Sequence, residues 1–212
     1  GDVAGKFKVL FETGQAPDRF ETRFYGKDGK RFIGKAAVSR VFEEGKLVLE
    51  DLPDQVTLEI ETVIHPDRNT ALEGLYVSGD MFCTQCEAEG FRRITFFPDR
   101  PDVMARYTTT LVADRNRYPV LLSNGNPVEQ GEMDDGRHWV SWQVPFPKPS
   151  YLFALVAGDL VYQEDEFVTF NQRRVTLRLY VEKENIGKCD HGLRSLKQAM
   201  RWDEETYGRE YD

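Results

Sequence analysis

Residues 175–182 read VTLRLYVE, a stretch in which apolar and polar side chains alternate one by one. This period of two is typical of a half-buried β-strand, whose successive side chains point to opposite faces of a sheet. The same alternation recurs in VTLEIE at residues 56–61 and in HWVSWQV at residues 138–144. Many short strands of this kind predict a mainly β fold built from antiparallel sheets.

Turn signals separate the predicted strands. The dipeptides are Asp28-Gly29, Asn124-Gly125 and Asp135-Gly136, which tolerate the positive backbone angles of tight turns. The run PFPKP at residues 145–149 interrupts the pattern, because proline cannot donate to a β-ladder. We interpret this run as an extended connector.

The apolar pattern changes its period near the end of the sequence. We expect a helix over residues 191–207, with Asp190 capping its N-terminus and Gly208 ending it. The apolar positions near one face of this helix are Leu193, Leu196, Met200 and Tyr207. We interpret the acidic run DEE at residues 203–205 as a solvated face. The change of period suggests that a second structural unit begins after about residue 160.

Composition and charge exclude several classes of partner. The chain has 212 residues and a net charge of −8, and this size fits one compact domain or two small ones. The acidic balance argues against nucleic acid and anionic membranes, which require clustered Lys and Arg. The longest apolar run, residues 151–157, is far shorter than the roughly 20 residues of a membrane helix. Three cysteines, an odd number, predict reduced thiols and a cytoplasmic location.

The cysteines also raise the question of a metal site. Cys83 and Cys86 have the spacing of a metal-binding or redox pair, and Cys189 with His191 would be needed to complete a zinc site. If residues 80–87 form one strand, however, positions 83 and 86 face opposite sides and their sulfurs diverge. We therefore interpret them as ordinary thiols, at least one of them buried, and predict no metal ligands in this chain.

The same strand would place Gln85 and Glu87 together on one face, at its end. A carboxylate beside an amide can bind a primary ammonium group, which offers three hydrogen-bond donors. From spacing alone, a solvated strand end is the more common explanation of such a pair. Both interpretations stay open at this point.

A long run of specific motifs extends from residue 70 to residue 158. The motifs are TALEGLY at 70–76, CTQCEAEGFRRIT at 83–95, PDRPD at 98–102, YPVLLSNGN at 118–126 and PKPSYLFALVAG at 147–158. In these segments the sequence closely resembles the N-terminal domain of zinc aminopeptidases of the aminopeptidase N family. The resemblance implies a saddle-shaped antiparallel β-sheet or sandwich domain over residues 1–160. Residues 161–212 would then be the opening strands and first helix of an incomplete thermolysin-like catalytic domain.

The resemblance also implies roles for two residues. In that family, the Gln and Glu of a TQxE segment reach into the active site, where the Glu holds the free α-amine of the substrate. The matching positions are Gln85 and Glu87. The implied partners are the N-terminus of a peptide substrate and the catalytic domain of the same polypeptide.

The catalytic chemistry of the family needs residues that this sequence does not contain. The implied cofactor, zinc, is held by an HExxH pair of histidines and a downstream Glu, and a GxMEN segment lies beside the substrate. Neither motif occurs in the 212 residues. We therefore expect a fragment of a larger enzyme that has no catalytic residue and no peptidase activity of its own.

Two alternatives remain open. The chain could come from a family member with a different task, such as an inactive or epoxide-hydrolysing relative. It could also be a free-standing, non-catalytic β-rich binding or scaffolding module. In addition, the family's further N-terminal strands are not recognisable in this sequence, and unpaired sheet edges would favour self-association.

Overall fold

A computed structural model describes most of the chain from residue 59 onward and short strands before it. The backbone is described for residues 5–6, 8–12, 20–23, 31–33, 40–43, 46–49 and 59–211, and side chains for residue 62 and residues 64–211. The chain divides into two compact units, Gly1–Gly158 and Asp159–Asp212. The predicted turn at 28–29 and the predicted strand residues 56–58 lie outside the described residues.

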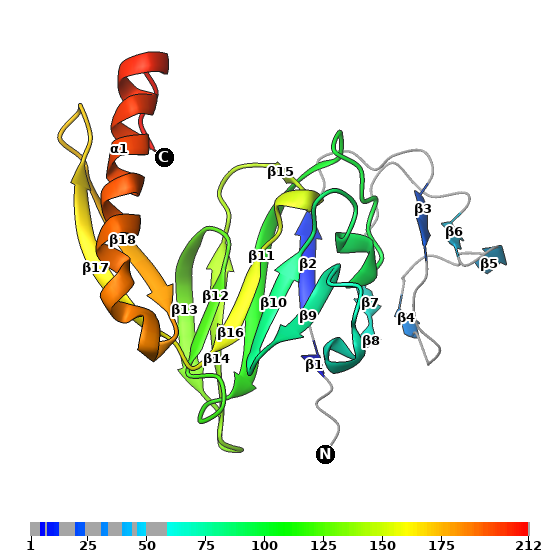
Figure 1. The fold of residues 1–212 in the computed structure, drawn as a ribbon. Helices are drawn as coiled ribbons and strands as arrows, with labels where there is room; N and C mark the ends of the chain where they lie inside the picture. Colours follow the sequence, from blue (N-terminus) through cyan, green and yellow to red (C-terminus); the bar gives the residue numbers. More distant parts are fainter. Residues whose placement is uncertain are drawn as a thin grey trace. The chain divides into compact units, whose positions relative to one another are not determined.

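The first unit contains a four-stranded sheet that carries the candidate site. Its strand order is β12 (Val120–Ser123), β16 (Leu155–Gly158), β10 (Met81–Gln85) and β9 (Gly74–Ser78). All its neighbouring strands are antiparallel (Figure 1).

A five-stranded sheet forms the second layer of this unit. It consists of β13 (Asn126–Glu132), β14 (Arg137–Gln143), β11 (Met104–Asp114), β15 (Lys148–Pro149) and β2 (Lys8–Glu12), with β2 paired to β11. The predicted strand at 138–144 is confirmed as β14. The end of the proline-rich run at 145–149, interpreted as a connector, adds a short pairing to β11 through β15.

The remaining described strands make small antiparallel pairings. They are β1 (Gly5–Lys6) with β8 (Val63–Ile64), β4 (Arg31–Ile33) with β7 (Glu59–Glu61), and β3 (Phe20–Arg23) with β6 (Lys46–Leu49) and β5 (Arg40–Glu43). Short 3-10 helices span Pro66–Arg68, Phe91–Arg93, Ser150–Leu152 and Lys183–Lys188. The predicted fold class, mainly antiparallel β, is confirmed.

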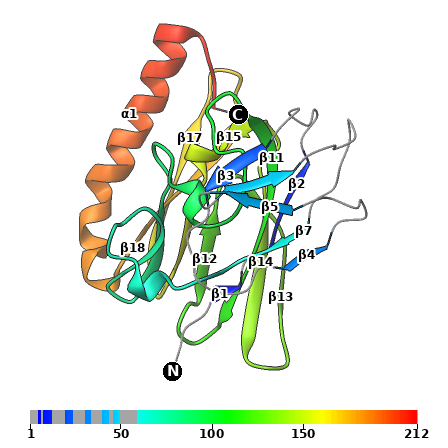
Figure 2. The same ribbon diagram turned by 90° about the vertical axis from the view of Figure 1, so that its right-hand side faces the viewer.

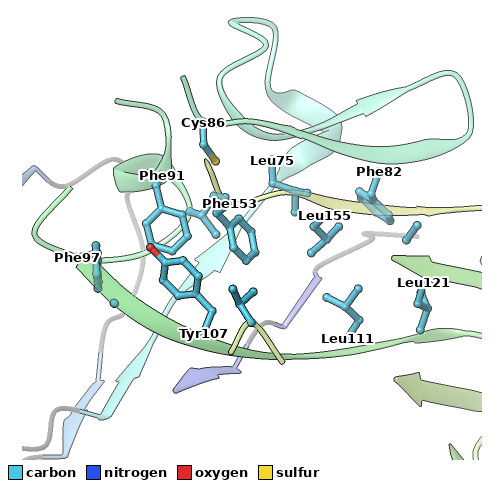
Figure 3. Close-up of a cluster of buried hydrophobic side chains, with 14 of the residues drawn as sticks. Leu75, Phe82, Cys86, Phe91, Phe97, Tyr107, Leu111, Leu121, Phe153 and Leu155 are labelled. Carbon is cyan, nitrogen blue, oxygen red and sulfur yellow. The ribbon is translucent and has the colours of Figure 1, made fainter. Parts of the chain in front are cut away.

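The core of the first unit lies between its two large sheets. Leu75 and Leu155 come from the four-stranded sheet and face Tyr107 and Leu111 of β11 (Figure 3). Phe153 lies beside this layer, with ring centroids 5.1 Å from Phe91 and 6.4 Å from Tyr107. These aromatic contacts anchor the segment that follows β10, because Phe91 is fully buried.

Two predicted turns contain glycines with positive φ. Gly136 has φ 82° in the hairpin between β13 and β14. Gly125 has φ 89°, and a Cβ there would lie 2.1 Å from the Gln143 carbonyl oxygen. Only glycine fits this second position, so the dipeptide signal at 124–125 reports a true backbone constraint.

The second unit is a hairpin with one α-helix. β17 (Val161–Val168) pairs with β18 (Arg174–Val181), which confirms the strand predicted from VTLRLYVE. The helix α1 (Cys189–Tyr207) lies along this hairpin in both Figure 1 and Figure 2. Phe167 and Leu177 of the hairpin are buried against Leu193 of the helix. None of the helices in the described part of the chain combines the length and apolar composition needed to cross a membrane.

The predicted limits of α1 are half right. Gly208 ends the helix with φ 63°, as expected. Asp190 does not cap the start, because a 3-10 helix at Lys183–Lys188 runs directly into α1 and places Asp190 in its first turn. The Asp190 carboxylate instead accepts a hydrogen bond from the Gln163 side chain at 2.7 Å.

The predicted apolar face of α1 also needs correction. Leu193 is buried and Met200 is partly buried, but Leu196 and Tyr207 are exposed. Cys189 and Glu204 take the remaining buried positions, so Glu204 does not belong to a solvated acidic face. The stripe of Cys189, Leu193, Met200 and Glu204 follows steps of four, seven and four residues, which keeps it on one side of the helix.

Candidate functional site

The two predicted binding residues lie where β10 ends and a turn begins. Gln85 is the last residue of β10 and pairs with Gly74 of β9, whereas Glu87 lies in the turn at residues 87–90. The prediction that residues 80–87 form one strand is therefore wrong at its end. The Gly90 N–H donates to the Cys86 carbonyl at 2.8 Å, and this bond closes the turn and stops the strand.

The neighbouring strand explains why the ladder ends here. β16 pairs with β10 only at Phe82 and Cys83. At Thr84 the side-chain hydroxyl oxygen, in place of a backbone carbonyl, accepts the hydrogen bond from the Leu155 N–H at 2.8 Å. Beyond Thr84, residues 85–87 lack a β16 partner and the chain is free to turn.

The structure brings Gln85 and Glu87 together by a route that alternation did not predict. The Gln85 side-chain amide donates to the Glu87 backbone carbonyl at 3.2 Å. Both residues are exposed, and the Glu87–Ala88 peptide bond is cis. Within the described part of the chain, the Glu87 carboxylate has no hydrogen bond or ion pair. The turn therefore presents an unpaired, acceptor-only group to solvent.

Two glycines allow this turn to pack closely against β9. Gly74 has φ 74°, and its N–H lies next to Gly90 at the base of the turn. A Cβ on Gly90 would meet the Gln85 carbonyl oxygen at 2.4 Å and both the Cys86 Cα and the Gly74 nitrogen at 3.0 Å. All three are backbone atoms, so no side-chain movement can relieve the clash. Glycine at 90 fixes how closely the turn approaches the sheet.

Gly90→Ala is expected to lower the free energy of unfolding of the 212-residue chain. Forcing a methyl group into well-packed backbone costs about 1 to 3 kcal/mol. The measurement is urea unfolding followed by near-UV circular dichroism. Gly187→Ala is the matched control, because a Cβ there meets no atom within 4 Å. An unchanged unfolding midpoint for Gly90→Ala would contradict the packing described for the turn.

A buried polar network involves Arg92, which lies in the 3-10 helix directly after the turn. Asp99 is 5% exposed, and its carboxylate accepts hydrogen bonds from the Arg92 backbone N–H at 3.0 Å, the Arg92 Nε at 3.2 Å and the Ser150 hydroxyl. The sequence indicated that Arg92 and Arg93 could pair with carboxylates but not with which ones. Arg92 pairs with Asp99 and Glu89, and Arg93 with Glu73. Nothing local marks Asp99 as buried, since it follows a proline in a polar segment.

The three cysteines form no disulfide bond. Cys83 is partly exposed, Cys86 is 3% exposed and Cys189 is buried, and all three are free. The prediction that at least one of Cys83 and Cys86 is buried is confirmed. Cys86 faces the aromatic cluster of Phe91 and Phe153 (Figure 3). Burial, followed by the negative charge of Asp99, raises the pKa of Cys86 to about 12.

Cys86 is expected to resist alkylation in the folded chain. Its folded pKa lies above the ordinary value of 9.0, so folding favours the neutral thiol, and the nucleophilic thiolate is scarce at pH 8. The stability linked to this thiol is fully present below pH 9 and is lost as the pH rises toward 12. Iodoacetamide labelling at pH 8 with peptide mapping should modify Cys83 first and Cys86 only in urea. Equal labelling rates for Cys86 in native and unfolded chain would show that the burial is wrong.

The described residues do not fit a metal site. No group of three or more His, Cys, Asp or Glu side chains in the described part of the chain is arranged to hold an ion. The exposed Glu87 carboxylate and the Gln85 amide offer negative charge and hydrogen bonding at the turn, which suits recognition of a cationic group.

Comparison with known protein sequences gives two principal findings. Residues 18–152 match the family model described as the Peptidase M1 N-terminal domain. Over 170 residues the chain is 59% identical to aminopeptidase N of Escherichia coli K12, which covers 80% of this chain and 20% of that protein. The chain thus spans about a fifth of the length of the curated relatives that it matches.

Solved structures agree with the sequence matches. Aminopeptidase A of Legionella pneumophila, in complex with aspartic acid, aligns with a TM-score of 0.75 and 29% identity over 95% of this chain and 29% of that chain. An M1 zinc metallopeptidase mutant of Deinococcus radiodurans aligns with a TM-score of 0.63 and 17% identity over 82% of this chain and 42% of that chain. The second likeness concerns the fold alone.

Proposed function

Because the chain belongs to the Peptidase M1 N-terminal domain family, we propose that it is the substrate-anchoring region of a zinc-dependent aminopeptidase. The parent enzyme removes single amino acids from the N-terminus of peptides. Glu87, assisted by Gln85, binds the free α-amine of the substrate. Residues 1–160 form the N-terminal domain, and residues 161–212 open the catalytic domain of the same polypeptide.

One observation carries this proposal. Glu87 holds an exposed carboxylate that has no partner among the described residues, in a turn fixed by the Gly90 contact and the Cys86 carbonyl. A carboxylate placed in this way is ready to accept a charge-assisted hydrogen bond from an ammonium group. A solvated strand end would need neither the close glycine packing nor the bond from the Gln85 amide.

An amine anchor determines which peptide bond is cut. When the α-amine is bound, the first peptide bond lies at a fixed distance from the turn, and a peptide without a free N-terminus cannot bind in the same register. The enzyme is then an exopeptidase because of where it holds the substrate. Zinc and its ligands belong to a part of the polypeptide outside the described residues. The three free thiols support a cytoplasmic location.

The proposed exopeptidase activity can be tested with a peptide and its N-acetylated twin. The full-length enzyme should release residues one by one from the free peptide and leave the acetylated peptide intact. The isolated 212-residue chain should cleave neither peptide, with or without added zinc, as followed by mass spectrometry. Cleavage of the acetylated peptide would contradict an amine anchor. Chelator-sensitive cleavage by the isolated chain would contradict its assignment as an anchoring region.

A further inference from the structure

The geometry points to Arg92 and Asp99 as positioning residues that hold the Glu87 turn in register for the substrate amine. This inference rests on the proposed function, since it concerns how the same turn is held. Asp99 is buried, and the Arg92 side chain is bound by Asp99 and Glu89. Both act through the turn, and their contacts lead from a buried carboxylate to a residue two positions from Glu87.

The buried end of this chain of contacts is Asp99. Its side chain is 3% exposed, and an ionised carboxylate at such a site must be compensated by charge and hydrogen bonds. Arg92 supplies both, through its backbone N–H at 3.0 Å and its Nε at 3.2 Å, and the Ser150 hydroxyl adds a third bond. The same Arg92 donates from a terminal nitrogen to the Asp99 carbonyl at 2.8 Å. The guanidinium is thus fixed in one orientation.

The outer end of the guanidinium reaches the turn. Arg92 lies in the 3-10 helix Phe91–Arg93, which directly follows the turn, and its other terminal nitrogen is 3.1 Å from the Glu89 carboxylate. Glu89 occupies the turn with Glu87. The turn is therefore tied at its base by the Gly90 to Cys86 hydrogen bond and at its outer end by the Arg92 to Glu89 ion pair.

The ion pair between Arg92 and Glu89 also affects the charge of the turn. Arg92 compensates Glu89, so within the described residues Glu87 is the carboxylate of the turn that remains unpaired. Loss of the guanidinium would release the turn and leave two free carboxylates beside each other. An ammonium ligand would then meet a mobile, doubly acidic loop in place of one fixed acceptor. Misplacement of such a contact by about 1 Å can cost on the order of 100-fold in rate.

The test uses two ligands that differ only in the α-amine, leucine hydroxamate and 4-methylpentanohydroxamic acid. The dissociation constant of the amine-free ligand, divided by that of leucine hydroxamate, measures the contribution of the amine. Both constants are measured on the full-length enzyme. We expect Arg92→Met to lower this ratio at least tenfold while the affinity for the amine-free ligand stays unchanged. Arg92→Lys keeps the positive charge but loses the planar guanidinium and its paired donors. Its ratio should therefore lie between those of the wild type and Arg92→Met.

Three further variants keep the test decisive. Glu89→Gln breaks only the outer, exposed ion pair, so it should fold normally and lower the ratio by about two- to fivefold. If Arg92→Met does not fold, Glu89→Gln tests the inference in its place. Glu87→Gln should bring the ratio close to one. Arg137→Met removes an arginine from an ion pair on β14 and should leave the ratio unchanged.

The outcomes separate the inference from the function on which it rests. An unchanged ratio in the Arg92 and Glu89 variants, with the ratio lost in Glu87→Gln, would overturn the positioning role and leave the amine anchor in place. An equal loss of affinity for both ligands in Arg92→Met would show a general structural defect and would also overturn it. A ratio that survives Glu87→Gln would overturn the amine anchor together with this inference.

Discussion

Replacing Glu87 with glutamine in the full-length enzyme is expected to lower kcat/KM for a leucine anilide substrate by about ten- to 150-fold. A hydrogen bond to a charged group contributes about 1.5 to 3 kcal/mol, and each 1.36 kcal/mol corresponds to a factor of ten in rate. Glutamine keeps the size of the side chain and one acceptor oxygen but removes the negative charge. The charge is the part of the interaction that an ammonium group recognises.

Two controls accompany this variant. Glu129→Gln removes an exposed carboxylate from β13, and it should leave kcat/KM unchanged. The zinc content of both variants should equal that of the wild type, because the described residues do not fit a metal site. Wild-type kcat/KM in Glu87→Gln would show that this carboxylate does not bind the substrate amine.

Glu204→Ala is expected to lower the free energy of unfolding of the second unit by about 3 kcal/mol. Glu204 is 2% exposed, and its carboxylate accepts the Phe170 N–H at 3.1 Å and pairs with Arg201. Removing one partner of a buried ion pair typically costs about 3 to 5 kcal/mol. We expect the lower end of this range, because the Arg201 side chain is partly exposed and water can reach it.

The contacts of Arg201 explain why this pair matters to the hairpin. Arg201 donates to the Val168 carbonyl at 2.9 Å, and its guanidinium carbon lies 4.7 Å from the Phe167 ring centroid and 5.1 Å from that of Phe170. Arg201 and Glu204 therefore tie α1 to the loop between β17 and β18. Loss of the carboxylate leaves both the guanidinium and the Phe170 N–H without this acceptor.

Urea unfolding followed by circular dichroism at 222 nm measures this effect, since α1 is the one α-helix in the described part of the chain. Glu205→Ala is the matched control, because Glu205 is the exposed neighbour on the same helix. A change within about 0.5 kcal/mol is expected for an exposed site of this kind. Equal unfolding midpoints for the two variants would show that the Glu204 contacts contribute no stability.

Local patterns predicted the strands and the end of the helix. The alternation in residues 138–144 and 175–182 predicted β14 and β18, because one face of each strand packs against a core. Gly125, Gly136 and Gly208 marked positions of positive φ, a property that depends on the residue itself. Features of this kind are encoded within a few residues and can be found without knowledge of the fold.

Features that depend on distant segments were missed. β10 pairs with β16 only at Phe82 and Cys83, and the next contact runs from the Leu155 N–H to the Thr84 hydroxyl, 71 residues apart in the chain. Glu204 is buried because Phe170, Arg201 and the loop near Val168 surround it, whereas an acidic run on a helix ordinarily faces water. Asp99 is buried for a similar reason, since its partner Ser150 lies 51 residues away. None of these contacts leaves a periodic signal in the sequence.

The candidate site contains features of both kinds, those encoded locally and those that depend on other segments. Alternation selected Gln85 and Glu87, and the structure does bring them together, but through an amide-to-carbonyl hydrogen bond at the start of a turn. The role of Glu87 as an amine anchor came from the resemblance to a family and stays a prediction. The residues that hold the turn, Gly90 and Arg92, became recognisable only from their contacts.

A crystal structure of the full-length enzyme with a bound amino acid or dipeptide would examine the role of Glu87 without any substitution. We expect the α-ammonium nitrogen to lie about 2.7 to 2.9 Å from a Glu87 carboxylate oxygen, the range of a charge-assisted hydrogen bond. A ligand whose α-ammonium group is held by other residues, with the Glu87 carboxylate left in solvent, would contradict the role proposed for this chain.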